Sequence, residues 1–327
     1  MIARSAAAAL LGWGLAGSAA SGSELAFVTN QGAQTLQIVD LAAGAVLARL
    51  EIPGRPAGAA VAPNGRRAYV TSPEGRFVSV VDSAGRRVIA RIEAGGGPLG
   101  VAVSSDSRRL FVADWHGSSV GVFDAESGAS LGALATGASP SGIDVTPDGR
   151  NILTADREDD QVSIFDASTL ARIGVVKVGS KPFGLTVSPD GTRAVTANVG
   201  SNDISVIDIA RASEAARPKV GQRPYAAAFA AGKIFVTDQY SGTVSVLDGV
   251  SFGRLAAIPV GDHPEGIAAT ADGAMVYVAV WFDNELVGID TRALAVTARI
   301  KTDDGPRAFG RFMSQDAAKA AHQEDAK

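Results

Sequence analysis

Short apolar runs, each closed by turn-forming residues, recur along almost the whole chain. The clearest copy, residues 181–221, contains the runs Leu185–Val187, Ala194–Ala197 and Ile204–Ile207, and a fourth run leads to Gly221. The first three runs end at Ser188-Pro189-Asp190-Gly191, at Asn198 and at Asp208. Four short apolar runs closed by turn residues predict a four-stranded antiparallel meander.

The repeat has a period in the low forties. The aspartate that closes the third run recurs at steps of 42 residues, with one step of 40, as Asp40, Asp82, Asp124, Asp166, Asp208, Asp248 and Asp290. The proline that opens each copy keeps the same steps, at Pro56, Pro98, Pro140, Pro182, Pro224, Pro264 and Pro306. A period of this length, built from four short strands, is typical of a β-propeller blade. We therefore predict an all-β fold, a seven-bladed β-propeller of four-stranded antiparallel blades.

The two ends of the repeat predict how the ring closes. The first copy begins with a second-strand sequence, residues 27–30, and the last proline-led strand, residues 306–312, is followed only by an Ala-rich, charged stretch. We expect residues 306–312 to be the innermost strand of blade 1, because joining both termini in one sheet covers its edges. Phe309, Arg311 and Phe312 fit the repeat loosely.

The strand sequences resemble a named family. Phe27-Val28-Thr29-Asn30, Tyr69-Val70-Thr71-Ser72 and Phe235-Val236-Thr237-Asp238 are similar to the segment for which the YVTN-repeat β-propellers are named, and the Ser-Pro-Asp-Gly turn at 188–191 agrees. The resemblance implies an exported accessory protein of the periplasm or cell surface, attached to a quinoprotein or haem pathway. It is specific for the fold and poor for function, because propellers host many activities.

Residues 1–20 differ from the rest. Arg4, an apolar stretch over residues 6–16 and the small residues Ser18-Ala19-Ala20 predict a secretory signal peptide. An uncleaved anchor is the alternative, and the stretch is short for a membrane span. We expect the propeller to occupy residues 21–313, with a polar tail over 314–327, in a periplasmic or secreted monomer without a membrane span after cleavage.

Composition excludes several function classes. The net charge is −4 without a basic block, which argues against a nucleic-acid partner. The absence of cysteine excludes disulfides, thiol catalysis and covalent c-type haem.

The top face of the ring is the expected binding face. It carries the b–c loops and the connections between blades, which differ from copy to copy, whereas the a–b turns at the other end are nearly uniform. The residues on either side of each opening proline should rim the central channel, and the candidate binding residues among them are Arg55, Lys181, Phe183, Arg223, Tyr225, His263, Glu265 and Arg307. Cations and aromatic rings suit an anionic, partly planar ligand, and a merely solvated rim is the alternative.

The b–c loops add aromatic candidates. Trp115-His116 and Trp281-Phe282 occupy equivalent places in two loops, and Tyr240 matches them in a third. Such residues are favoured as interface anchors, although they also serve to cover blade tops. Strand b ends in Asn30, Ser72, Asp114, Asp156, Asn198, Asp238 and Val280. That regularity favours turn capping over a metal site.

We interpret the chain as an exported, non-catalytic propeller that binds a protein partner or a small anionic ligand on its top face, in an accessory or scaffold role. The sequence identifies no catalytic residue, no metal site and no cofactor. The alternative is a cofactor-handling or enzymatic propeller. One form, which resembles the haem-binding propeller of periplasmic nitrite reductases, binds haem or a quinone and makes His263 a candidate iron ligand. The other resembles propeller lactonases and makes Glu265, Asp156 and Asp238 candidate metal ligands.

Overall fold

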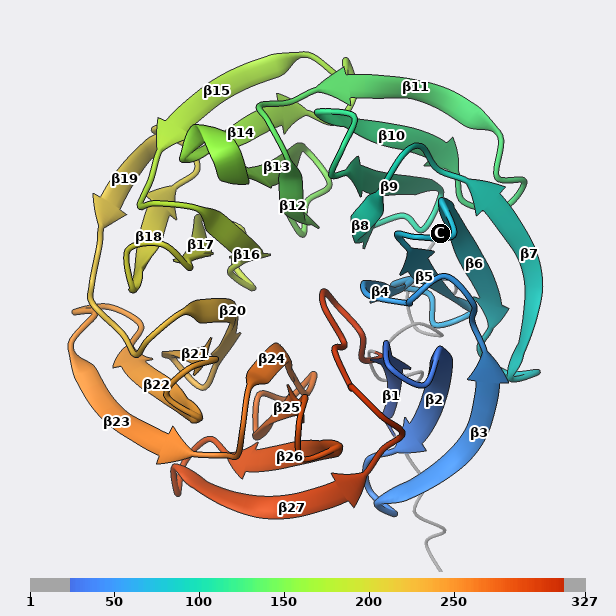
Figure 1. The fold of residues 1–327 in the computed structure, drawn as a ribbon. Helices are drawn as coiled ribbons and strands as arrows, with labels where there is room; N and C mark the ends of the chain where they lie inside the picture. Colours follow the sequence, from blue (N-terminus) through green and yellow to red (C-terminus); the bar gives the residue numbers. More distant parts are fainter. Residues whose placement is uncertain (1–23, 315–327) are drawn as a thin grey trace, which may run out of the picture.

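The computed structural model describes residues 24–314, and they form a ring of seven blades around a central axis (Figure 1). The predicted signal peptide and most of the predicted tail lie outside the described residues. Six blades are four-stranded antiparallel sheets, and the seventh joins β1, β2 and β3 to the C-terminal segment. The predicted all-β, seven-bladed fold is confirmed.

In blades 2 to 7 the strands run from the centre outward in chain order, as strands a to d, and blade 1 supplies strands b to d from the N-terminal end. The innermost strands a are β4 (Ala59–Val61), β8 (Pro98–Val103), β12 (Pro140–Val145), β16 (Pro182–Val187), β20 (Pro224–Ala230) and β24 (Pro264–Ala269). Strands b are β1 (Leu25–Asn30), β5 (Arg67–Ser72), β9 (Arg109–Asp114), β13 (Asn151–Asp156), β17 (Arg193–Asn198), β21 (Lys233–Asp238) and β25 (Met275–Val280).

The outer half of each blade is equally regular. Strands c are β2 (Thr35–Asp40), β6 (Phe77–Asp82), β10 (Ser119–Asp124), β14 (Gln161–Asp166), β18 (Asp203–Asp208), β22 (Thr243–Asp248) and β26 (Glu285–Asp290). The outermost strands d are β3 (Ala45–Glu51), β7 (Arg87–Glu93), β11 (Ser130–Ala135), β15 (Arg172–Lys177), β19 (Ser213–Ala216), β23 (Arg254–Pro259) and β27 (Ala295–Lys301). A single 3-10 turn, η1 (Arg157–Asp159), lies in the b–c loop of blade 4 within the described residues.

The core lies between neighbouring blades. Strands b and c are buried on both faces, whereas strands d are mostly exposed. One cluster joins Leu153 and Val162 of blade 4 to Leu185 and Ala194 of blade 5. Each sheet therefore buries both faces against its neighbours, as stacked repeats do.

The aspartate that closes strand c caps the following turn. Asp166 Oδ1 accepts hydrogen bonds from the backbone N–H of Ser168 and Thr169, and Asp208 and Asp248 do the same in their own turns. The hydrogen bond from the Ser168 hydroxyl, followed by those from Thr169, lowers the pKa of Asp166 to about 2. This aspartate therefore stabilises the turn between strands c and d of its blade.

Glycines on the innermost strands let the blades meet at the axis. A Cβ on Gly100 would collide with the carbonyl oxygen of Ser141 in the next blade. Gly58, Gly184 and Gly266 face the main chain of the next blade in the same way. The absence of a side chain is what permits this close approach of backbones.

The C-terminal segment closes the ring where the sequence predicts it. It lies beside β1 through the bridges Asn30–Pro306 and Ala26–Met313, and the Arg307 N–H donates to the Thr29 carbonyl at 2.8 Å. In Figure 1 this segment runs from β27 toward the axis, between β24 and β4.

The closing segment differs from the expected strand in being irregular. Ala308 and Gly310 have positive φ values of 44° and 105°, which interrupt the ladder to β1. Between them the chain turns to blade 2, where Phe309 O accepts from Ala59 N at 2.8 Å and Arg311 O accepts from Val61 N at 2.9 Å. One segment therefore joins the first two blades.

Candidate functional site

The top face is built from paired loops of the same blade. The residue before the opening proline adopts a left-handed conformation, with φ of 52° at Arg223 and 57° at His263. Its carbonyl accepts the first N–H of the b–c loop, from Gln239 to Arg223 and from Trp281 to His263, both at 3.0 Å. This pairing places the pre-proline side chain beside the b–c loop of its own blade.

His263 lies at the centre of an exposed cluster. Its Nδ1 is 2.7 Å from Asp262 Oδ1, and its ring centroid is 4.6 Å from Phe282 and 5.4 Å from Tyr240. Tyr240 and Phe282 are 58% and 59% exposed, although both are large rings. The guanidinium of Arg223 lies 5.0 Å from the Tyr240 ring. Blades 6 and 7 thus present a histidine, two open rings and a cation together.

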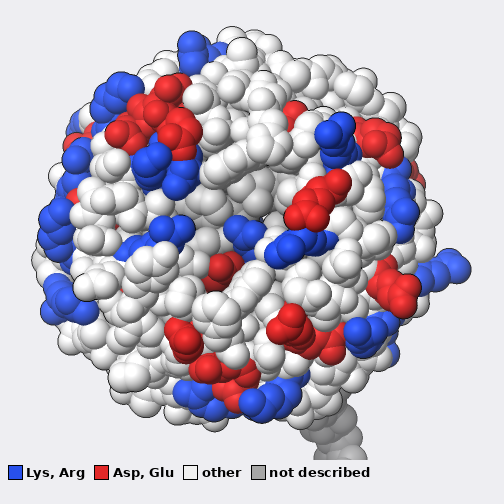
Figure 2. All heavy atoms as spheres, in the orientation of Figure 1, with Lys and Arg blue, Asp and Glu red and all other residues white. Residues whose placement is uncertain are grey.

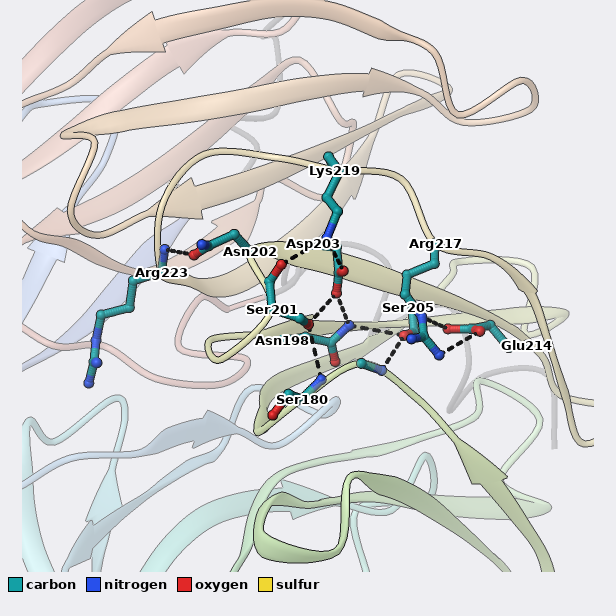
Figure 3. Close-up of polar contacts among 11 residues, drawn as sticks. Ser180, Asn198, Ser201, Asn202, Asp203, Ser205, Glu214, Arg217, Lys219 and Arg223 are labelled. Atoms are coloured by element: carbon teal, nitrogen blue, oxygen red, sulfur yellow. Dashed lines mark hydrogen bonds and ion pairs between the residues drawn. The ribbon is translucent and has the colours of Figure 1, made fainter.

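Hydrogen bonds fix the two loops that carry these side chains. The Asp262 N–H donates to Asp283 Oδ2 at 3.1 Å, and the Arg223 N–H donates to Asn202 Oδ1 at 2.7 Å. Figure 3 shows Asn202 next to a polar network in blade 5. At its centre the buried carboxylate of Asp203 accepts hydrogen bonds from Asn198, Ser201 and Lys219. The position of Arg223 therefore depends on the neighbouring blade.

A chain of polar contacts runs from Arg223 into the channel mouth. Arg223 Nε donates to Gln239 Oε1 at 2.8 Å, and Gln239 Nε2 donates to Glu265 Oε1 at 2.7 Å. Glu265 Oε2 lies 3.2 Å from Arg307 Nε, which also donates to the Tyr225 hydroxyl at 2.7 Å. The view down the ring axis shows a face hollowed at its centre, with acidic and basic side chains intermixed around it (Figure 2).

Burial alters the acidity of this chain of groups. It raises the pKa of Glu265, although the charge of Arg307 opposes that shift. Burial also raises the pKa of the Tyr225 phenol. Tyr225 therefore stays protonated, and it accepts the Arg307 hydrogen bond with its hydroxyl oxygen.

Aromatic rings fill the channel below these polar groups. The ring centroid of Phe183 is 4.6 Å from Tyr225 and 5.1 Å from Phe309, and that of Tyr225 is 5.8 Å from Phe309. All three side chains are buried. These rings therefore fill the channel at this level and leave no room there for a large ligand.

The remaining predicted residues lie elsewhere on the rim. Arg55 and Lys181 form ion pairs with Glu74 at 3.3 Å and Glu158 at 2.9 Å. Exposed His116 lies against Gly97, on the blade 3 side of the mouth.

The two tryptophans are partly exposed and partly packed against neighbouring residues. Trp115 packs edge-on against Phe183 at 6.1 Å and is only partly exposed, and Trp281 lies against Gly305. The exposed rings are their neighbours, Tyr240 and Phe282.

The residues that end strand b face their own blades. Asp156 Oδ2 accepts from Gln161 and Ser163, and Asp238 Oδ2 accepts from Thr243 and Ser245. Both carboxylates are fully buried in these contacts. They do not converge with Glu265, and the described residues contain no group of three or more His, Asp or Glu side chains arranged to hold a metal ion.

Three residues of the site escape the sequence analysis: Asp262, Gln239 and Phe309. Aligning the repeats places Asp262 directly before His263 and Gln239 in the b–c loop of blade 6. Phe309 fits the repeat loosely. Its ring fills the channel, which accounts for a large side chain at a position where the other repeats have smaller residues.

Two family matches cover adjoining parts of the chain. Residues 20–138 match the family described as cytochrome D1 heme domain, and residues 130–228 match the family described as lactonase, 7-bladed beta-propeller. No curated protein matches the chain. Among residues 24–314, no helix is long and apolar enough to cross a membrane.

Solved structures share the architecture at low identity. Hydrazine synthase of Kuenenia stuttgartiensis has 20% identity and a TM-score of 0.71, with 78% of this chain and 89% of that chain covered. A functionally unknown protein from Desulfotomaculum acetoxidans DSM 771 has 13% identity and a TM-score of 0.77, with 89% and 99% covered.

A third structure is that of dihydro-heme d1 dehydrogenase NirN in complex with DHE. It has 17% identity and a TM-score of 0.68, with 90% of this chain and 76% of that chain covered. At these identities the likeness concerns the fold. The chain is thus a seven-bladed β-propeller, and parts of it match a haem-domain family and a lactonase family.

Proposed function

We propose that this protein is an exported propeller that binds a haem-type tetrapyrrole on its top face, with His263 as the iron ligand. The observation that carries the proposal is the state of the His263 ring. Asp262 holds Nδ1, and Nε2 has no hydrogen-bond partner among residues 24–314. A carboxylate on one ring nitrogen orients the other toward a metal and raises its basicity.

The residues around His263 fit such a group. Imidazole is a common ligand of haem iron. The exposed rings of Tyr240 and Phe282 offer apolar area to a planar macrocycle, and the Arg223 guanidinium beside them favours an anionic one. When bound, haem supplies an iron able to exchange electrons or to take a further small ligand. The protein's part is to position His263, whose Nδ1 lies beside Asp262.

The comparisons favour this function over the partner-binding role that the sequence first suggested. The cytochrome D1 heme domain match and the NirN structure, whose title names a complex with DHE, concern proteins with haem-related groups. The lactonase match has no comparable support in the site, because Asp156 and Asp238 bond within their own blades. We assign no reaction to the protein.

Haem titration tests the proposal. The wild-type protein should bind haem at one equivalent and give a sharpened Soret band, and His263→Ala should weaken binding at least about tenfold. Asp262→Asn should weaken it less, by loss of orientation. His116→Ala is the matched control, because this exposed histidine lies on the other side of the mouth. Unchanged spectra and affinity in His263→Ala would contradict the assignment.

We also propose that the chain belongs to the YVTN-repeat propellers and is exported as a monomer. The strand sequences and the leader-like residues 1–20 support this. Mass spectrometry of the periplasmic fraction should find a mature protein that begins near Ser21. A membrane-bound form that keeps Met1 would contradict export by cleavage.

A further inference from the structure

The two arginines of the channel mouth are held in the same way. Each uses its Nε in the polar chain, Arg223 toward Gln239 and Arg307 toward Glu265 and Tyr225. The chain continues without a break through the side chains of Gln239 and Glu265. These contacts orient both guanidinium groups through Nε. They leave the terminal atoms Nη1 and Nη2 of each arginine outside the row of polar contacts.

The outer ends carry unused hydrogen-bond donors. No described residue accepts a hydrogen bond from Nη1 or Nη2 of Arg223 or of Arg307, in contrast to Arg311, whose Nη2 bonds Asp144 at 2.9 Å. The Arg307 side chain is only 18% exposed, and that of Glu265 is 10% exposed. A guanidinium presents five donors, and the unpaired Nη groups of both arginines are not among the buried unpartnered atoms, so they remain accessible to a ligand.

The charges at the mouth favour an anion. The row of polar contacts holds two arginines and one carboxylate, Glu265, so that it keeps an excess positive charge even when Glu265 is ionised. Asp262 is engaged with His263. The terminal nitrogens of arginine match the two oxygens of a carboxylate or a similar oxyanion in a bidentate pair.

We propose that Arg223 and Arg307 form an oxyanion site at the channel mouth, which takes the carboxylate of a small molecule. Gln239, Glu265 and Tyr225 position the two guanidinium groups. The site is separate from the iron ligand proposed above and does not require it. The carboxylate comes either from a free small acid or from a side chain of the tetrapyrrole.

Calorimetric titration with succinate, with acetate and with inorganic phosphate tests the site at constant ionic strength, with chloride as the reference anion. We expect saturable binding of at least one oxyanion by the wild-type protein. Arg223→Gln and Arg307→Gln should each weaken it by about tenfold or more. Arg223→Lys should also lose affinity, since lysine keeps the charge but not the fork.

Matched variants distinguish loss of the oxyanion site from the loss of any rim charge and from destabilisation of the fold. Arg55→Gln, at the equivalent pre-proline position of blade 2, should bind as the wild type does. Because Arg307→Gln leaves a buried carboxylate, the double variant Arg307→Gln/Glu265→Gln tests the site without that charge. Absence of saturable oxyanion binding, or equal affinity in the wild type, Arg223→Gln and the double variant, would overturn the proposal.

Haem and its dimethyl ester distinguish the two sources of the carboxylate. If succinate or acetate competes with haem but not with the ester, the site holds a tetrapyrrole carboxylate. If both bind at once, it holds a free acid. His263→Ala should abolish the Soret change and keep oxyanion binding, so that failure of one proposal is visible apart from failure of the other.

Discussion

In blades 1, 4, 5 and 6 a single side chain at the end of strand b bonds strand c of the same blade at its top. Asn30 bonds Thr35 and Gln37, five and seven positions later, and Asn198 bonds Asp203 and Ser205 at the same spacing. Blade 2 departs from this arrangement. Ser72 stands at the equivalent position, and neither its hydroxyl nor that of Ser79 has a hydrogen-bond partner among the described residues.

This contrast predicts unequal effects of the same change. Asn198→Ala removes two hydrogen bonds and leaves the buried Asp203 short of a donor, which should cost about 1–3 kcal/mol of unfolding free energy. Ser72→Ala should be nearly neutral, because no bond is lost. Urea unfolding measures both, and equal destabilisation would argue against the role given to Asn198.

The turn aspartates predict sensitivity to acid. Hydrogen bonds lower the pKa of Asp166 to about 2, and they also lower the pKa values of Asp208 and Asp248. A lowered folded-state pKa adds stability above the unfolded value, about 4, and that stability is lost as pH falls through the folded pKa. The urea midpoint should therefore drop steeply between about pH 4 and about pH 2.

The variant Asp166→Asn isolates one contribution to that drop. Asparagine keeps the acceptor oxygen that caps the turn but does not titrate. Its midpoint should fall less than that of the wild type over the same acid range. An identical fall in both proteins would show that this carboxylate does not contribute to acid unfolding.

The close approach of the innermost strands of neighbouring blades limits the size of the side chains that they can carry. Gly100 and Gly142 have no room for a side chain against the next blade, whereas Ala226 occupies the equivalent position in blade 6. The strands that carry the candidate site are therefore positioned by backbone contacts around the axis.

We predict that Gly100→Ala destabilises the ring by about 1–3 kcal/mol, because a methyl group would press on the Ser141 carbonyl. Gly253→Ala is the control, since its nearest neighbour is the Ser251 side chain at 3.5 Å. Thermal unfolding should separate the two variants. A neutral Gly100→Ala would mean that the blades shift apart at little cost.

The whole ring depends on one irregular segment. Residues 306–314 contact blade 1 through Thr29, blade 7 through Glu265 and blade 4 through Asp144, which pairs with Arg311 at 2.8 Å. They also place Phe309 in the channel and Arg307 at its mouth.

Truncation tests this dependence. A chain that ends at Gly305 loses all of these contacts and exposes the edges of β1 and β4, so that we expect aggregation in place of a soluble monomer. A chain that ends at Ser314 keeps every contact described above and should retain the wild-type melting temperature. Size-exclusion chromatography and thermal unfolding compare them, and equal stability would refute the closure scheme.

The fold was predictable because the same sequence pattern recurs seven times. The spacing of Asp40 through Asp290 defines the blades, and the missing first strand and surplus last strand indicate closure. The irregular path of residues 306–314 was not predictable, because Ala308 and Gly310 adopt left-handed conformations that follow from contacts with blade 2.

The candidate site was predictable only in part. Aligned repeats singled out His263, Tyr240 and Phe282 as residues of one face. Their grouping depends on contacts between neighbouring blades, which a single repeat does not encode. For the same reason the packing of Trp115 against Phe183, from the next blade but one, was not predictable.

The direction of the closing segment has a mechanical consequence. It runs antiparallel to β1, so that Leu25 and Ser314 lie at the same end and bond each other, with Ser314 N donating to Leu25 O at 2.8 Å. A force that pulls residues 25 and 314 apart would break the hydrogen bonds between β1 and the closing segment one after another. It would not load all of them at once, as a force along the strands would. The ring would then open under a small load applied through both termini, and tethering through a single terminus would avoid this.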